Sequence, residues 1–230
     1  MNSRGSVTST SIGVGFAVGL YGISFGALSV AAGLDFWQTQ VLSLLMFSGG
    51  SQFAFVGVIA GGGLAAVGPA IVSAWLIGVR NGFYAIRMSS LLGVTGLLKT
   101  ISAQITIDES TAVATAQDTV PKARRGFWLT GLAVFVFWNS FTAVGALLGG
   151  IAGDPSQFGL DAAAAVAFLA LVWPQLRSLQ ANTVAAGSFL VAVSLSPLLP
   201  VGLPVIAAGL VGILVGWSNW LARSNAGEVK

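Results

Sequence analysis

The stretch on which the fold depends is Leu45-Met46-Phe47-Ser48-Gly49-Gly50-Ser51-Gln52-Phe53-Ala54-Phe55, in the middle of an apolar run from about Val41 to Ala60. This run is long enough to cross a bilayer. A simple spanning helix gains nothing from Ser-Gly-Gly-Ser-Gln at its centre, because each glycine there costs about 1 kcal/mol relative to alanine. A backbone that loosens inside lipid must find partners in protein or in a water-filled cavity. We therefore expect a broken membrane helix, and broken helices build the substrate sites of secondary transporters.

The composition of the whole chain indicates an integral membrane protein. Of its 230 residues 55% are hydrophobic and only 7% are charged, whereas soluble domains carry about 25% charged residues. The net charge of +3 is small and spread over several loops, so it does not indicate a nucleic-acid surface. The sequence has neither cysteine nor histidine, which excludes disulfides, thiolate catalysis and proton transfer through histidine.

The hydropathy pattern predicts an all-α protein with a single membrane domain, residues 1–230, and about seven spans. They cover roughly residues 12–32, 38–60, 64–84, 126–149, 160–179, 182–199 and 203–221. A basic connecting segment, 86–125, separates the third span from the fourth, and we expect it to be a surface loop with one interfacial helix. An eighth span near 88–106 is the alternative. It would bury Lys99, at a cost of about 2.5–3.5 kcal/mol.

The positive charges predict the orientation. With three spans ahead of the basic segment and the N-terminus outside, Arg4 lies outside with Asp154. The cytoplasmic side then receives the other clear loop charges, which are Arg87, Lys99, Lys122, Arg124, Arg125, Arg177, Arg223 and Lys230.

A weak internal repeat supports the broken helix. Gly33-Leu34-Asp35 recurs as Gly159-Leu160-Asp161, an offset of 126 positions (159 − 33). The second segment of each half is interrupted at a matching point, by glycines in one and by Trp173-Pro174-Gln175 in the other, where proline removes a backbone donor. Three spans before the basic segment give the halves, 11–85 and 126–221, opposite polarity, which is the inverted-repeat pattern of transporters. Because few positions match, chance similarity is the alternative.

The polar residues at the break are the candidate ligand contacts, because each needs a partner inside the membrane. Ser48, Gly49, Gly50, Ser51 and Gln52 offer freed backbone groups and a side-chain amide to a ligand that carries both charges. The alternative is a locally packed polar cluster that closes hydrogen bonds between helices.

Apolar neighbours complete the expected site. Phe47, Phe53 and Trp173 are expected to wall a pocket for an apolar side chain, and Gln175 to hold the polar end of the ligand. Tyr21 and Ser24 in the first span are further candidates for ligand contact. The small-residue pairs four positions apart are expected only to allow close helix packing; they are Gly15/Gly19, Gly145/Gly149 and Gly212/Gly216.

Four charged or polar residues are candidates for gating or coupling: Arg80, Asn81, Asp108 and Glu109. Arg80 either snorkels to the membrane interface or pairs an acidic residue or a substrate carboxylate, and Asp108 and Glu109 are its nearest acidic candidates. These acids have an alternative role, since Thr106-Ile107-Asp108-Glu109 fits a capping box at the start of a helix through Ser110–Gln117. The carboxylates of Asp35 and Asp161 are expected to cap helices.

The sequence carries no enzyme signature. It has no Gly-x-Ser-x-Gly, no nucleotide-binding glycine-rich loop followed by lysine, and no cluster of metal ligands. We therefore expect a protein that is not an enzyme and needs no cofactor.

Several motifs together resemble the AzlC/YgaZ family, the large subunits of branched-chain amino acid exporters. Phe47 to Phe53 resembles the family's "aGxxQf" signature, Gly22-x-x-Phe25-Gly26 its opening motif, and Ile107-Asp108-Glu109-Ser110 its Asp-Glu-Ser/Thr motif. Gly159-Leu160-Asp161 and Trp173-Pro174 are similar to features of its second half. Gly78-Val79-Arg80-Asn81 stands where the family usually has Asn-x-Arg-His, so this chain lacks that histidine. Either coupling passes through Asp108 or Glu109, or the substrate and energetics differ from those usual in the family.

The resemblance implies export of branched-chain or other hydrophobic amino acids from the cytoplasm. It also implies a multi-pass location in the cytoplasmic (inner) membrane of a bacterium and a small membrane subunit of the AzlD/YgaH type as partner. The mechanism expected is alternating access, with the substrate held at the helix breaks near Ser48–Gln52 and Trp173–Gln175. A passive channel for a small polar solute, or a structural subunit active only with its partner, is the alternative.

Overall fold

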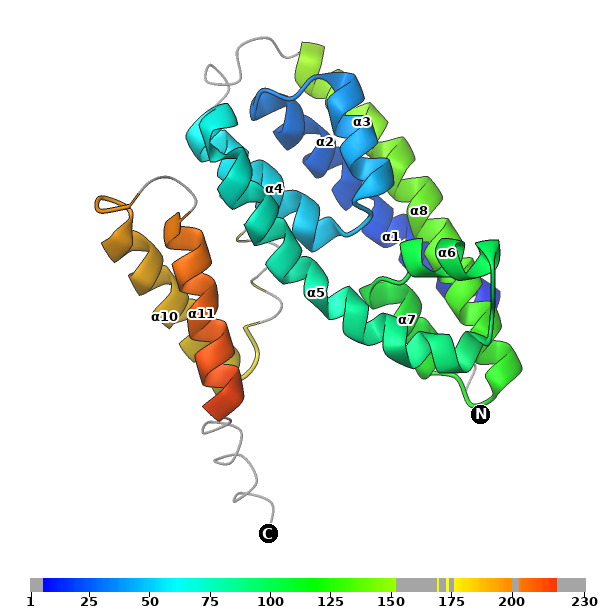
Figure 1. Ribbon diagram of the computed structural model, residues 1–230. Coiled ribbons are helices and arrows are strands. Elements are labelled where there is room, and N and C mark those ends of the chain that lie inside the picture. Colours follow the sequence, from blue (N-terminus) through cyan, green and yellow to red (C-terminus); the bar gives the residue numbers. More distant parts are fainter. Residues whose placement is uncertain (1–5, 152–168, 170–172, 174–175, 200–202, 219–230) are drawn as a thin grey trace.

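The computed structural model describes residues 6–151, 169, 173, 176–199 and 203–218, and every regular element in this part of the chain is a helix (Figure 1). Three helical stretches are long and apolar enough to cross a membrane: Val7–Ala31, Gly49–Leu92 and Val120–Ile151. This confirms the all-helical membrane class. In chain order the helices are α1 (Val7–Gly19), α2 (Tyr21–Ala31), α3 (Phe36–Leu45), α4 (Gly49–Gly62), the 3-10 turn η1 (Gly63–Ala66), α5 (Val67–Leu92), α6 (Leu97–Gln104), α7 (Asp108–Thr115), α8 (Val120–Ile151), α10 (Leu179–Leu195) and α11 (Leu203–Ser218).

The centre of the fold is a parallel pair made of the continuous α1–α2 stretch and α8. Small residues let the two backbones touch: a Cβ added to Gly15 would lie 2.6 Å from the Cβ of Ala133, and Gly145 abuts the Ile23 carbonyl. Further along, Gly149 lies against Ala27. The packing role expected for Gly15/Gly19 and Gly145/Gly149 is therefore confirmed.

The predicted span 38–60 is broken as expected, but it does not cross the membrane as one rod. α3 ends at Leu45, three residues turn, and α4 begins at Gly49 and runs back toward the end of the bundle at which α3 starts, diverging from α3 (Figure 1). Leu34, just before α3, therefore packs with Ile59 and Val67 at the far end of α4. With 10 and 14 residues, the two helices measure about 15 and 21 Å, so each is too short to cross the hydrocarbon core of about 30 Å. The segment is a re-entrant hairpin, defined here as residues 36–62.

The re-entrant hairpin corrects the predicted topology. Two crossings, α1–α2 and α5, precede the basic segment instead of three. The end of α5 and the starts of α1 and α8 consequently meet at one end of the bundle. Arg124 Nε donates to the Leu91 carbonyl (2.8 Å) and Arg125 Nη2 to Thr8 Oγ1 (3.0 Å).

The expectation that the start of the chain lies opposite the basic segment is therefore wrong. The opposite polarity of the two halves is wrong as well, because α1–α2 and α8 open the halves in the same direction. Hydropathy gives the length of an apolar run but not whether it turns back, and the error has this origin. The second predicted break lies outside the described residues except for Trp173.

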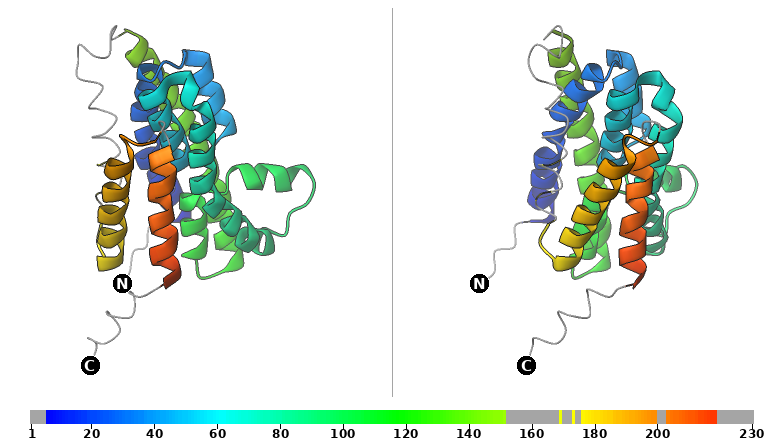
Figure 2. Two further views of the ribbon diagram at one scale, coloured as in Figure 1. Left: turned by 60° about the vertical axis from the view of Figure 1, so that its left-hand side comes forward. Right: turned by 90° about the vertical axis from the view of Figure 1, so that its left-hand side faces the viewer.

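The basic segment contains two short helices and no eighth span. α5 continues to Leu92, and α6 follows with 8 residues, about 12 Å in length and too short to cross a bilayer. α6 stands out from the side of the bundle (Figure 2), and Lys99 on it is exposed. The segment thus differs from the expected loop with one helix: it holds the end of α5 and two short helices, of which α7 buries Ser110, Thr111, Val113 and Ala114.

α10 and α11 form an antiparallel hairpin, as the short connection near 201–202 predicts. Ser188 Oγ donates to the Ala208 carbonyl (2.9 Å), and a Cβ on Gly187 would lie 3.0 Å from Val211 Cγ1. Ser178 starts α10 by accepting a hydrogen bond from the Ala181 amide (3.1 Å). α11 also packs against α5. The predicted span 160–179 falls almost wholly outside the described residues.

Candidate functional site

Side-chain amides donate hydrogen bonds to the last backbone carbonyls of α3. Gln52 is fully buried, and its Nε2 donates to the carbonyls of Ser43 (3.2 Å) and Met46 (2.7 Å). Gln104, from the end of α6, donates to the carbonyls of Leu44 (2.8 Å) and Leu45 (3.2 Å). These bonds satisfy carbonyls that a helix end leaves without intrahelical partners.

Trp138 of α8 connects Gln52 to the aromatic core. Its indole Nε1 donates to Gln52 Oε1 (2.9 Å), and its ring stacks near Phe25 and meets Phe53 edge to face. Gln52 therefore uses both amide hydrogens and its oxygen within the protein, which fits the packed polar cluster considered as the alternative. Phe53 is buried in this core and lines neither of the cavities described below.

The N-terminal end of α4 is different, because no side chain caps it. Ser48 takes an extended conformation (φ −156°, ψ 104°) without a side-chain cap. Its carbonyl accepts the hydrogen bond of the Gln52 amide (2.9 Å). The amides of Gly49, Gly50 and Ser51, which form the first turn of α4, therefore have no acceptor within the helix. Such a turn carries a partial positive charge and favours an anionic group.

A small cavity of about 60 Å³ lies against this open end. It brings the two predicted sets of residues together: Phe47, Ser48, Gly49 and Gly50 from the hairpin, with Arg80, Asn81, Asp108 and Glu109. The rest of its lining is mostly apolar and comes from α1, α8 and the start of α7: Val18, Ile107, Val134 and Trp138. The cavity has room for only a few water molecules, each of which needs about 10–15 Å³.

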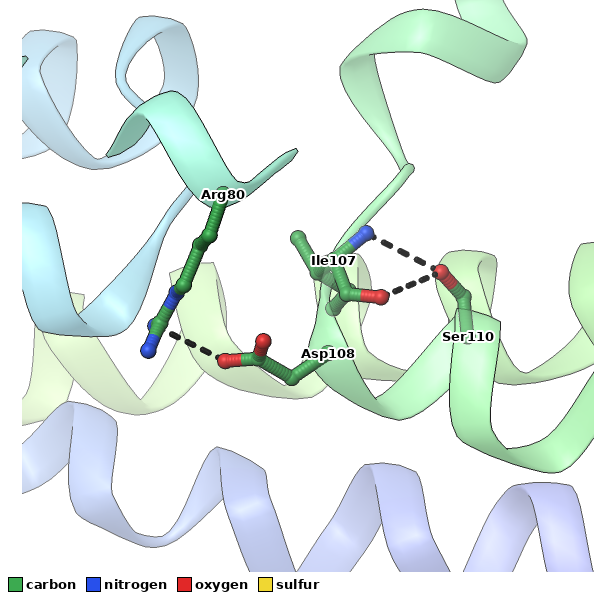
Figure 3. A network of polar contacts seen from close by, with 4 residues as sticks. All are labelled: Arg80, Ile107, Asp108 and Ser110. Atoms are coloured by element: carbon green, nitrogen blue, oxygen red, sulfur yellow. Dashed lines mark hydrogen bonds and ion pairs between the residues drawn. The ribbon is translucent and has the colours of Figure 1, made fainter. Parts of the chain in front are cut away.

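An ion pair closes this cavity. Arg80 Nη2 lies 2.7 Å from Asp108 Oδ2, and both side chains are about two-fifths exposed (Figure 3). Arg80 also lies on Gly50, since a Cβ there would be 2.9 Å from its Nη2. The prediction that Arg80 pairs an acidic residue is confirmed, with Asp108 as the partner.

Several buried polar atoms around the tip have no partner among the described residues. They include Arg80 Nε, Asn81 Oδ1 and Ser51 Oγ. Buried polar groups in proteins are nearly always hydrogen-bonded, so each of these atoms is available to water or to a ligand.

Asp108 and Glu109, at the start of α7, do not form the predicted capping box. Ser110 Oγ accepts from the Ile107 amide (3.1 Å) and donates to the Ile105 carbonyl (2.7 Å). Thr106 instead donates to the Ser102 carbonyl (2.6 Å). The predicted helix is present, but the capping box built on Thr106 and Glu109 is wrong, because the threonine turns toward α6.

Glu109 differs from its neighbour Asp108 in environment. It lies on α7, which is too short to span a membrane, and burial raises the pKa of its carboxyl group above the usual range. The negative charge of Asp108 acts in the same direction, while a backbone hydrogen bond and Arg80 oppose it. Glu109 therefore keeps its proton to higher pH than an exposed glutamate.

A larger groove of about 640 Å³ adjoins the small cavity and shares Phe47, Ser48 and Asn81 with it. Its volume falls within the range of about 300–1,000 Å³ typical of small-molecule sites. It runs between the hairpin tip, α5 and the end of α6. Its lining is largely apolar and includes Met46, Ile71, Trp75 and Val79, with Ser51, Gln104 and Thr106 as polar members.

The remaining predicted residues lie away from these cavities or outside the described part. Tyr21 and Ser24 are exposed on α2, and Trp173 is exposed as well; none of them lines either cavity. Gln175 and Asp161 lie outside the described residues. Asp35 caps α3 through a reciprocal pair of bonds with Gln38 (2.8 and 2.9 Å), which confirms its capping role.

Two residues at the tip were not predicted as members of the site. Neither Trp138 nor Gln104 was among the candidate site residues. Their partners lie 86 and about 60 positions away in sequence, so no local pattern reports these contacts.

Comparison with known proteins gives one family. The family model described as AzlC protein matches residues 13–152, which is more than half of the chain and includes the hairpin, Arg80, Asp108 and α8. No curated protein and no solved structure matches the chain.

Proposed function

The chain belongs to the AzlC family, which is associated with branched-chain amino acid transport, and we propose that it is a secondary transporter that exports branched-chain or other hydrophobic amino acids. The observation that carries this proposal is the meeting of an open helix N-terminus, a cation and two acids around one cavity beside an apolar groove. A zwitterion with an apolar side chain has matching chemistry.

In this proposal the polar end of the substrate lies in the small cavity. Its carboxylate faces the free amides of Gly49 and Gly50 and the Arg80 guanidinium, and its ammonium group faces the acids of α7. The side chain extends into the adjoining groove, against Phe47, Trp75 and Val79. Ser48 borders both spaces and Ser51 lines the groove. Gln52 acts as a positioning residue that fixes the tip.

The size of the cavity supports alternating access as the proposed mechanism. At about 60 Å³ it is below the range of small-molecule sites, so the substrate enters only when the hairpin, α5 or α7 moves apart. A closed cavity of this kind favours an occluded site over a passive channel, which needs polar groups along several spans. Asn81, Asp108 and Glu109 are then candidates for gating, and Glu109 for carrying the coupling proton.

Location and partner form part of the same proposal. The basic end of the bundle, with Arg87, Lys99, Lys122, Arg124 and Arg125, faces the cytoplasm by the positive-inside rule. The membrane is the inner membrane of a bacterium, and a small AzlD/YgaH-type subunit is the proposed partner. A chain that binds no amino acid alone but binds one with that subunit would support the structural-subunit alternative.

Leucine efflux from loaded vesicles tests the proposal. We expect saturable efflux by the reconstituted protein, competition by isoleucine, valine and methionine, no competition by glutamate, and a change in rate when a pH gradient is imposed. Asp108→Asn should abolish efflux, whereas Lys99→Gln on exposed α6 should keep it. Efflux that shows neither saturation nor competition would contradict the proposal and favour a channel.

A further inference from the structure

The Arg80–Asp108 pair holds the place that the two charges of a zwitterion would take. We propose that the substrate enters by exchanging with this pair, its carboxylate taking Arg80 and its ammonium group taking Asp108, so that recognition requires both charges on one ligand. This inference rests on the proposed function and deepens it by stating which ligands the site rejects.

The first support is the set of charged side chains that line the cavity. Among the described residues that line it, Arg80 is the cation, and Asp108 and Glu109 are the acids. Arg80 and Asp108 neutralise each other at 2.7 Å. A zwitterion inserted between them leaves the net charge unchanged, and a ligand with one charge does not.

The second support is steric. With the pair closed, the cavity of about 60 Å³ excludes an amino acid. Both side chains remain about two-fifths exposed, and partly exposed pairs are weakly held because water screens them. The pair is therefore strong enough to close the empty site and weak enough for a ligand to replace.

The third support is the set of polar atoms that the pair leaves unsatisfied. Arg80 Nε and Asn81 Oδ1 are buried without a partner in the described part of the chain, and no side chain caps α4. An incoming carboxylate gives acceptors to the guanidinium edge and to the helix amides. An incoming ammonium group gives donors to Asp108 and to the Asn81 oxygen.

The consequence is a selection rule. An amine without a carboxylate leaves Arg80 without an anion, and an acid without an amine leaves Asp108 without a cation, with only the Tyr84 hydrogen bond on it. Hydrogen bonds to charged groups contribute about 1.5–3 kcal/mol, which corresponds to about 10- to 150-fold in affinity. 4-Methylpentanoate and 3-methylbutylamine, each retaining most of leucine's apolar chain, should therefore bind the wild-type protein at least about 10-fold more weakly than leucine.

Titration calorimetry of the purified full-length protein with these three ligands tests the exchange. In Asp108→Asn, Arg80 has no partner, so the preference should shift toward 4-methylpentanoate by at least about 10-fold relative to wild type. In Arg80→Gln, the shift should favour 3-methylbutylamine. Lys99→Gln, on exposed α6, is the matched control and should keep the wild-type order of ligands.

The outcomes separate the two proposals. Leucine binding by wild type with no shift in either variant overturns the exchange and leaves the proposed function standing. Equal wild-type affinity for leucine and 4-methylpentanoate also overturns it, and this arm does not depend on the folding of a variant. No binding of any amino acid, even with the small partner subunit present, overturns the proposed function itself.

Discussion

The two helix ends at the hairpin tip come from the same short break, yet the protein treats them in opposite ways. The carbonyls at the end of α3 are covered by Gln52 and Gln104, whereas the first amides of α4 have no side-chain cap and adjoin a cavity that contains Arg80. The covered end holds the tip rigid, and the uncovered end offers a partial positive charge. In the function proposed above, one half of the break is structural and the other half binds the substrate.

Removing the Gln52 amide, which covers the C-terminal end of α3, should have the largest effect on stability. Gln52→Leu removes the partners of the Ser43 and Met46 carbonyls and of the Trp138 indole, all in the interior. Each unpaired buried group costs about 1–3 kcal/mol, so we expect a loss of about 3 kcal/mol or more in unfolding free energy. Thermal unfolding in detergent, compared with Gln180→Leu at a half-buried position of α10, measures it. An unchanged melting temperature would contradict the structural role of Gln52.

Altering the open end should change binding more than stability. In Gly50→Ala the new Cβ meets the flexible Arg80 guanidinium at 2.9 Å, so Arg80 moves and leucine affinity should fall about 10-fold, the loss of one charged hydrogen bond. Stability should hold or rise by about 0.5–1 kcal/mol, because alanine favours a helix. The control is Gly13→Ala in α1, where the added Cβ meets nothing within 4 Å. Equal losses of stability in both variants would show that Gly50 serves only packing.

The pH dependence of leucine binding tests the role of the acids beside the open N-terminus of α4. Burial, with the charge of Asp108, raises the pKa of Glu109, so the group is neutral below that raised pKa and charged above it. The positive charge of Arg80 acts on this carboxyl as well, and Tyr84 of α5, which is hydrogen-bonded to Asp108, also interacts with its charge. Ionisation adds a second negative charge beside the substrate's ammonium group, so leucine affinity should rise a few-fold as pH rises through the raised pKa.

Glu109→Gln removes the titrating group, so affinity in this variant should stay level over the same pH range. Isothermal titration at a series of pH values measures both proteins, with Asp118→Asn, outside the small cavity, as the control. If leucine affinity varied with pH in the same way in wild type and in Glu109→Gln, Glu109 would have no part in binding.

The smallest effect should come from Gln104→Leu, which uncovers the same helix end from the outside. Gln104 is exposed and bonds the Leu44 and Leu45 carbonyls, and water can replace it there. We expect a loss of about 1 kcal/mol or less in stability and unchanged leucine affinity. A loss as large as that of Gln52→Leu would mean that α6, not Gln52, holds the tip.

The sequence located the break but not its geometry. Ser-Gly-Gly-Ser-Gln at 48–52 marks a point where an apolar helix loosens, and α3 and α4 indeed separate there. An apolar run of 23 residues fits one full crossing and a pair of half crossings equally well, so hydropathy could not report the return of α4. The wrong orientation of the chain's start followed from that single step.

The candidate site was predictable in its residues but not in its contacts. Arg80 and Asp108 were recognised as partners because few charges occur near the spans. The bond between Trp138 and Gln52 joins positions 86 apart and depends on α8 packing parallel to α1–α2. Such contacts follow from tertiary structure alone, as does the distinction between a covered and an open helix end.

The most direct test of the central claim asks whether residues 36–62 return to the side from which they enter. The chain contains no cysteine, so single cysteines report their side of the membrane without background. Trp37→Cys and Leu64→Cys replace exposed residues at the start of α3 and after α4, and Lys99→Cys and Lys122→Cys mark the basic end. In intact cells, an impermeant maleimide should label the first two and spare the last two, whereas labelling of 37 and 64 from opposite faces would contradict the re-entrant hairpin.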